Sequence, residues 1–168
     1  MKKELEDKLY AKYPKIFVQR KLPMTQTCMC WGIETGDGWY WLIDNLCEVL
    51  QWDIDHNKDP QIEATQVKEK FGTLRFYTNG ENDEQGGMIS LAEFMSGSIC
   101  ENCGSTEDVT QTKGWIVTLC KKCLKKREEL KSQSKPTAKS TLWSFLTKPI
   151  LGVVTDKGKY CQFFPMEI

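Results

Sequence analysis

The residues of this chain best suited to chemistry are four cysteines arranged as two pairs. Cys100 and Cys103 enclose two residues, and after sixteen further residues Cys120 and Cys123 do the same. Two CxxC pairs about 15 to 20 residues apart are a strong signature of a four-thiolate zinc site. We therefore predict one structural Zn²⁺ held by these four cysteines. The alternative is two disulfides or free buried thiols.

The residues around the pairs predict the elements that would position the thiolates. Gly104 supplies backbone freedom for a tight turn. The alternation of Trp115, Val117 and Leu119 predicts a strand leading into the second pair, and the residues after Cys120 are good helix formers. Knuckle, hairpin and helix in this order predict a treble clef, with a plain zinc ribbon as the alternative. Because a closed four-thiolate site leaves no position for water, the zinc should stabilise rather than catalyse.

The residues before the zinc module predict the small antiparallel sheet of an α+β body. Residues 24–33 alternate in the manner of a strand, and residues 62–78 predict a hairpin with Leu74 and Phe76 on one face. The polar, glycine-rich residues 79–87 are expected to form a loop. A short helix is expected to follow this loop and to lead into the first cysteine pair.

A helix is expected between the first strand and the hairpin, with Asp37 as its N-cap. Trp41 and Trp52 fall on its polar side, within about 20° of each other. An exposed aromatic pair would mark a partner-binding surface. The alternative is that the N-terminal helix or the C-terminal segment covers both rings. The predicted buried stripe of this helix comprises Trp39, Leu42, Ile43, Leu46 and Leu50.

The order of these patterns divides the chain into four regions. We expect an α+β body over residues 1–98 and a four-cysteine zinc module with a basic helix over 99–131. A linker over 132–141 leads to an apolar segment over 142–168, which packs on the body or on a partner. The body and the zinc module are expected to form one unit rather than two independent domains.

The charge is balanced overall but unevenly distributed. The chain has 23 basic and 23 acidic side chains, yet residues 40–99 contain 11 acidic and 4 basic ones, and residues 120–139 contain 8 basic and 2 acidic ones. The basic helix is a solvated face, or it pairs with the acidic body, or it contacts phosphates or an acidic protein. Its candidate contact residues are Lys121, Lys122, Lys125, Lys126 and Arg127.

The groupings that could support catalysis are incomplete. His56 is the only histidine, and its neighbours Asp53 and Asp55 invite an acid–base hypothesis, but Pro60 follows closely and predicts a surface turn. Nucleases of the HNH type carry paired CxxC motifs but need histidines beside them, and residues 100–168 contain none. A phosphate-binding glycine loop is absent as well. We expect no enzymatic activity.

The remaining four cysteines have no diagnostic spacing. Cys28 and Cys30 share one face of the predicted strand, and with Cys47 and His56 they could form a second metal site. Cys161 is expected to be a packed thiol. The sequence does not assign a role to any of them.

The terminal regions carry no predicted export or membrane signal. The first residues lack the apolar core of a secretory signal. The longest apolar stretch, residues 142–154, is interrupted by Lys148 and Pro149 and is shorter than the roughly 20 apolar residues that cross a bilayer. We expect a cytoplasmic protein without a membrane span.

Three runs of sequence carry a resemblance to a known family. MTQTCMCWGIETGDGWYWLID, VKEKFGTLRFYTNG and CENCG with WIVTLCKKC resemble an uncharacterised family of small proteins of tailed bacteriophages. The similarity covers roughly residues 5–125, and QVKEKFGTLRFY is its most specific part. The resemblance implies a setting in the host bacterial cytosol during infection, and it supplies no activity.

These observations lead to one expected function and two alternatives. We expect a non-enzymatic, zinc-stabilised phage accessory protein that binds and inhibits a host or anti-phage defence protein. The first alternative is nucleic-acid binding through the basic helix over 121–139, and the second is sequestration of a small signalling nucleotide. The oligomeric state is left open.

Overall fold

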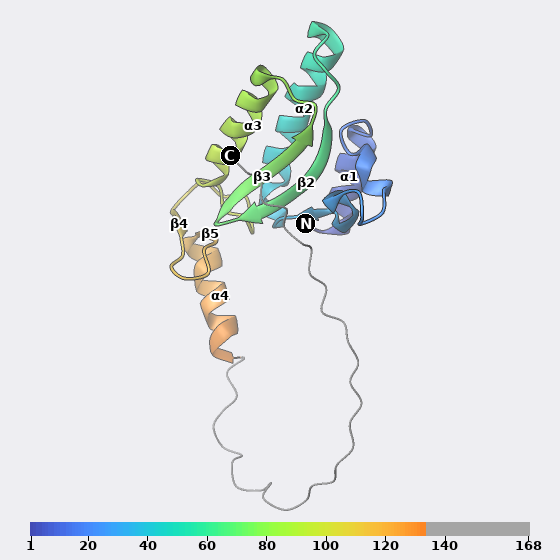
Figure 1. Ribbon diagram of the computed structural model, residues 1–168. Helices are drawn as coiled ribbons and strands as arrows, with labels where there is room; N and C mark the ends of the chain where they lie inside the picture. The colour runs from blue at the N-terminus through green and yellow to red at the C-terminus, as the bar shows by residue number, and fades with distance from the viewer. Residues whose placement is uncertain (134–168) are drawn as a thin grey trace, which may run out of the picture. The chain divides into compact units, whose positions relative to one another are not determined.

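The computed structural model describes residues 1–133, which belong to one compact unit, Met1–Ser134. In this part of the chain the fold is α+β, with four α-helices and a small mixed sheet, followed by a two-stranded hairpin (Figure 1). The helices are α1 (Lys3–Lys12), α2 (Tyr40–Asn57), α3 (Asp83–Ser96) and α4 (Lys121–Gln133). The strands are β1 (Ile33–Glu34), β2 (Glu63–Lys70), β3 (Thr73–Asn79), β4 (Val109–Gln111) and β5 (Thr118–Cys120).

The mixed sheet has the order β1-β2-β3, with β1 parallel and β3 antiparallel to β2. The predicted hairpin over 62–78 is confirmed, and Leu74 and Phe76 are both buried. In β2, the pairing shifts between Ala64 and Gln66. This irregularity explains why its two buried residues, Ala64 and Val67, are three positions apart rather than two.

Side chains from α3 cover the free edge of β3. Ser96 Oγ accepts a hydrogen bond from the backbone N–H of Leu74 at 2.8 Å, and Glu93 Oε1 accepts one from Phe76 at 2.9 Å. Glu93 also forms an ion pair with Arg75 at 3.7 Å. An edge strand whose N–H groups are already paired is a poor template for another strand. The same contacts position α3 along the sheet.

The predicted apolar stripe of α2 is confirmed, because all five of its residues are buried. α2 and α3 lie side by side against the sheet (Figure 1), and they share one apolar core with residues of α1 and the hairpin. The largest fully buried side chain is that of Trp39. Its Nε1 donates a hydrogen bond to the carbonyl oxygen of Ile99 at 2.9 Å, which links the start of α2 to the start of the cysteine module.

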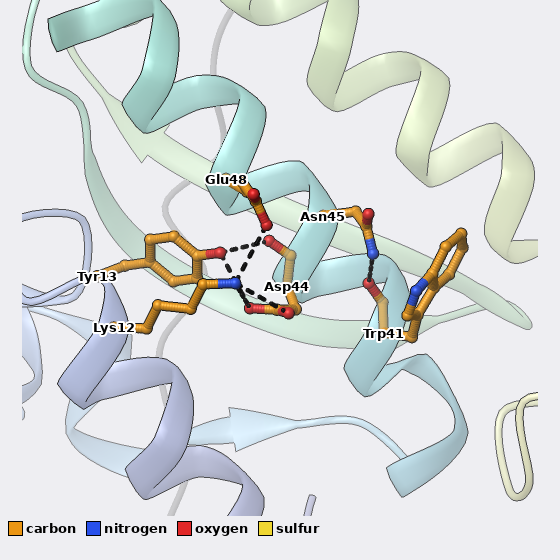
Figure 2. A network of polar contacts seen from close by, with 6 residues as sticks. All are labelled: Lys12, Tyr13, Trp41, Asp44, Asn45 and Glu48. Atoms are coloured by element: carbon orange, nitrogen blue, oxygen red, sulfur yellow. Dashed lines mark hydrogen bonds and ion pairs between the residues drawn. The ribbon is translucent and has the colours of Figure 1, made fainter.

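A polar network ties the end of α1 to α2 (Figure 2). Lys12 Nζ lies 3.1 Å from Asp44 Oδ1 and 3.1 Å from Glu48 Oε2. The Tyr13 hydroxyl donates to Asp44 at 2.9 Å. Burial raises the pKa of Tyr13 above its usual value, so the hydroxyl stays a hydrogen-bond donor at neutral pH. α1 is thus held on one flank of α2.

The predicted strand over residues 24–33 is wrong. Cys28–Trp31 form a single 3₁₀ turn, and only Ile33–Glu34 pair as a strand. The Thr27 hydroxyl accepts a hydrogen bond from Met29 N at 3.1 Å and so caps the turn, which ends at Gly32 with φ +78°. The hydrogen bond between the Thr27 side chain and Met29 N stabilises a turn where the alternating pattern predicted a strand.

The predicted starts of α2 and α3 are also corrected. Asp37 does not cap α2, which begins at Tyr40, because its carboxylate accepts a hydrogen bond from Lys2 N at 2.7 Å. Residues 83–87 form the first turns of α3 rather than part of a loop, so the helix expected over 88–95 is longer. Asn82 and Gln85 form a reciprocal capping box there, which outweighs the low helix propensity of two glycines.

Two further expectations concern the ends of helices. His56 lies in the last turn of α2 rather than in a surface turn, and the C-cap residue Lys58 is in the left-handed conformation with φ 64°. α4 runs through Gln133, two residues into the region expected as a linker. The rest of that linker and the apolar segment over 142–168 lie outside the described residues.

Candidate metal centre

The four predicted ligands come together in one cluster. The sulfur atoms of Cys100, Cys103, Cys120 and Cys123 all lie within 4.8 Å of one another, and this cluster could bind a metal ion. Cys103 Sγ and Cys120 Sγ are 3.7 Å apart, well beyond a disulfide bond of about 2.05 Å. None of the seven cysteines of residues 1–133 is in a disulfide. The alternative of two disulfides does not match this geometry.

The first pair sits on a tight turn of the backbone. The Cys100 carbonyl oxygen accepts a hydrogen bond from Gly104 N at 2.8 Å, and Cys100 N donates to Ser105 O at 2.8 Å. Gly104 has φ +78°, which is the conformational freedom predicted for it. Glu101 N donates to Thr118 O at 2.9 Å and so fastens the turn to β5.

The second pair sits where a strand passes into a helix. β4 pairs antiparallel with β5, whose last residue is Cys120, and α4 begins at the next residue. The expected order of knuckle, hairpin and helix is present. The strand is shorter than predicted, since Trp115 and Val117 precede it; Trp115 is exposed, whereas Val117 is buried.

Hydrogen bonds around the sulfurs favour the thiolate form unequally. The backbone N–H of Cys123 lowers the pKa of Cys120 to about 7. A hydrogen bond from the N–H of Ser105 lowers the pKa of Cys103. Desolvation and the neighbouring thiols outweigh this bond and raise the pKa of Cys103 to about 12. Asn102 Nδ2 donates to Cys123 Sγ at 3.2 Å. The hydrogen bonds around Cys120 thus favour its thiolate form, and a bound cation would favour the thiolate form of all four cysteines.

The first cysteine turn is fixed to the body by residues that no predicted motif includes. Gly38 N donates to Glu101 O at 2.8 Å, and Gly36 N donates to Glu101 Oε1 at 2.9 Å. A Cβ on Gly38 would lie 2.2 Å from Cys100 O, so only glycine permits this approach. The sequence signal for this contact is the GDG triplet of residues 36–38. Its two glycines are more typical of a phosphate-binding loop than of a close contact between two backbone segments.

The hairpin turn between β2 and β3 forms a second contact with the module. Phe71 and Gly72 both have positive φ, and the Gly72 carbonyl oxygen accepts a short hydrogen bond from Thr118 Oγ1. A Cβ on Gly72 would lie 2.8 Å from Ile116 Cγ2. The FG pair of the QVKEKFGTLRFY run is therefore the point at which the body contacts β5 and the residues before it.

The alternative second metal site of Cys28, Cys30, Cys47 and His56 is not assembled in residues 1–133. Cys100, Cys103, Cys120 and Cys123 are the only candidate group found among the described residues. Cys47 is buried in the main core, and burial raises its pKa well above the usual value. His56 is stacked on Trp52 with ring centroids 4.5 Å apart, and its Nδ1 is 2.8 Å from Trp52 O. Cys30 Sγ donates to Thr27 O.

Cys161 lies outside the described residues.

The basic residues of α4 divide into two groups on different sides of the helix. Lys121, Lys122 and Lys125 line a hollow of about 410 Å³ beside Cys103, Cys120 and Cys123. Lys126 and Arg127 line a larger hollow on the other side, together with Lys131. The five residues predicted as one contact surface therefore line two different hollows.

The two tryptophans predicted as partner contacts are both exposed. Trp41 is 64% exposed and Trp52 is 54% exposed, so α1 does not cover them. The C-terminal segment that could cover them lies outside the described residues. Figure 2 shows the Trp41 ring on the side of α2 away from Lys12 and Tyr13.

Fold and site together define a small α+β protein with a four-cysteine cluster that could bind a metal ion. No family model, no curated protein and no solved structure matches the chain. The resemblance to a bacteriophage family therefore stays a prediction. Within residues 1–133, none of the helices combines the length and apolar composition that a membrane crossing requires.

Proposed function

We propose that the four cysteines hold one Zn²⁺ with a structural role. Zinc bound by four thiolates at about 2.3 Å has sulfur–sulfur edges of about 3.8 Å, and the 3.7 Å between Cys103 and Cys120 is close to that value. The second observation is the size of the core around the cluster. Among the described residues its buried members are Cys100, Val117, Leu119 and Cys120, too few to stabilise this region without a metal.

We further propose that the protein is a non-enzymatic binding protein and that its partner is a protein. The observation that carries this proposal is the exposure of large apolar side chains on both α2 and α3. Trp41 and Trp52 are exposed on α2, and Leu91 and Phe94 are exposed on the neighbouring α3, Phe94 to 80%. Large exposed apolar surfaces are characteristic of protein-binding sites. His56, the only histidine, is engaged with Trp52 rather than placed beside the cysteines.

The chemistry of this surface restricts the partner. Residues 40–99 carry 11 acidic and 4 basic side chains, so the apolar rings of α2 and α3 stand on an acidic body. A complementary partner offers an apolar pocket with a basic rim. Together with the resemblance to bacteriophage proteins, this supports a phage accessory protein that binds a host or anti-phage defence protein in the bacterial cytosol and inhibits it.

Replacing Trp41 and Trp52 together by Ala should abolish partner binding while leaving the protein folded. Both rings are more than half exposed, so their loss removes little core packing and unfolding stability should change by less than about 1 kcal/mol. At an interface, buried tryptophans typically contribute about 2 kcal/mol or more each. Affinity capture from expressing bacteria identifies the partner, and calorimetry with the purified partner measures the loss.

The matched control is Trp115→Ala, which removes an even more exposed tryptophan from the cysteine module. It should capture the partner as the unchanged protein does. The proposal also requires that the purified partner binds at a fixed stoichiometry and loses its own activity in the complex. Capture of the same protein by the double variant would contradict it, as would a partner whose activity is unaffected.

A second candidate function is nucleic-acid binding through α4. It is favoured by the grouping of Lys126, Arg127 and Lys131 on one side of the helix, where they line a hollow of about 760 Å³. The logarithm of the binding constant should fall linearly with the logarithm of the salt concentration.

Replacing Lys126 and Arg127 by Gln should reduce the magnitude of the salt slope by about 1.4 for a single strand, because two phosphate contacts are lost. Fluorescence anisotropy at several salt concentrations measures this slope. No binding at low salt would remove the candidate.

A further inference from the structure

Two adjoining hollows share the side chains of Arg127 and Lys131. The first, of about 760 Å³, lies between the first cysteine turn, β5 and α4. The second, of about 320 Å³, lies between α4 and the residues that connect β4 to β5. Both volumes fall in the range of small-molecule sites. Arg127 and Lys131 form a cationic ridge between them.

The first hollow combines an apolar floor with polar walls. Val117, Leu119 and Leu130 supply the apolar lining. Glu101 and Asn102 lie on the side of the cysteine turn, and Lys126 lies on the side of α4. Such a lining suits a flat apolar group with hydrogen-bonding edges, next to an anion on the ridge.

The second hollow contains an exposed tryptophan on a well-anchored backbone. Trp115 is 77% exposed and lines this hollow with Lys113 and Arg127. The Thr112 hydroxyl donates to Trp115 O at 2.7 Å and accepts from Val117 N at 3.1 Å. The Trp115 ring is therefore exposed to solvent, while the backbone that carries it is fixed by hydrogen bonds. Exposed aromatic rings beside cations are the stacking platforms of proteins that bind single strands.

We propose that these two hollows bind a dinucleotide step of single-stranded nucleic acid, with one base in each hollow and the connecting phosphate on the ridge. This proposal rests on the second candidate function and specifies its ligand. One base lies on Val117, Leu119 and Leu130, and the next stacks on Trp115. Glu101 lines the first hollow and Glu128 the second, and both carboxylates repel a phosphate, which favours its position on Arg127 and Lys131.

The ligand is single-stranded because stacking on Trp115 needs an open base face. In a duplex, both faces of every internal base are covered by its neighbours, so that ring finds no partner. A free dinucleotide and a step within a longer strand offer the same chemistry, and the experiment separates them. The lysines beside the cysteines, Lys121, Lys122 and Lys125, line a different hollow and take no part.

The test uses the metal-loaded full chain and fluorescence anisotropy with a labelled twelve-nucleotide single strand. The same strand annealed to its complement, and unlabelled thymidine dinucleotide as a competitor, complete the ligand set. We expect the duplex to bind at least about tenfold more weakly than the single strand, since stacking contributes about tenfold or more per base. Competition by the dinucleotide at equal affinity assigns the site to free dinucleotides; weaker competition assigns it to strands.

Two pairs of variants test the assignment of residues. Trp115→Ala should weaken single-strand binding about tenfold or more, and Trp115→Phe should restore most of it because a ring remains to stack. Arg127→Gln should weaken binding more than Lys125→Gln, which removes the same charge from the other side of α4. Zinc content and circular dichroism show that each variant remains folded.

Three results would overturn the proposal: equal binding of duplex and single strand, an unchanged affinity of Trp115→Ala, or equal effects of Arg127→Gln and Lys125→Gln. In each of these cases the second candidate function survives, because α4 would still bind nucleic acid by charge alone. Absence of any binding at low salt would refute both. Binding by the Trp41→Ala, Trp52→Ala double variant should be unchanged, which separates this surface from the protein-binding one.

Discussion

Cys100→Ser is expected to release the zinc and unfold the module that follows the body. Among the described residues, Cys100 is fully buried in a core of four residues, two of which are proposed ligands. A structural zinc site contributes about 10 to 16 kcal/mol to the folding of small modules, and one lost thiolate removes a large part of that. Elemental analysis should fall from about one zinc per chain to almost none, and hydrogen exchange over residues 99–133 should accelerate.

The body should respond less than the module, because its core is a separate and much larger cluster. Cys30→Ser is the matched control: this thiol lies outside the cluster, and a serine hydroxyl can make the same hydrogen bond to Thr27 O. That variant should keep its zinc and its exchange pattern. A Cys100→Ser protein that binds zinc as tightly as the unchanged chain would show that this cysteine is not a ligand.

Gly38→Ala is expected to destabilise the protein without touching a ligand. A Cβ at this position would lie 2.2 Å from Cys100 O and 2.4 Å from Gly104 N, which are backbone atoms that cannot rotate away. Gly38 is not among the residues with positive φ, so the overlap alone causes the effect. We expect a loss of about 3 kcal/mol or more, a fall in melting temperature of roughly 10 °C, and faster removal of zinc by a chelator.

Gly87→Ala is the control for this substitution. Gly87 lies inside α3 with nothing within 4 Å of an added Cβ, so alanine should stabilise the helix by about 0.5 to 1 kcal/mol. The two substitutions are chemically identical and should have opposite signs. If Gly38→Ala melts at the same temperature and releases zinc at the same rate as the unchanged protein, the contact between residues 36–38 and the cysteine turn does not hold the module in place.

The elements that the sequence predicts well are those specified by neighbours along the chain. The stripe of α2 depends only on helical periodicity, and the hairpin over 62–78 depends on alternation around the Phe71–Gly72 turn. The predicted secondary structure was wrong where a single side chain accepts a hydrogen bond from a nearby backbone N–H. Thr27 converted an alternating segment into a 3₁₀ turn, and Asn82 started a helix within a run rich in glycine.

The sequence by itself determined the four-cysteine cluster, because two CxxC pairs joined by a hairpin bring four sulfurs together through local geometry. Only the tertiary structure revealed that Gly36 and Gly38 seat this cluster on the body, since they contact Glu101, which is about 65 residues away in the chain. It also divided the basic residues of α4 between two different hollows. No spacing within one segment encodes such approaches, because they depend on how distant segments pack.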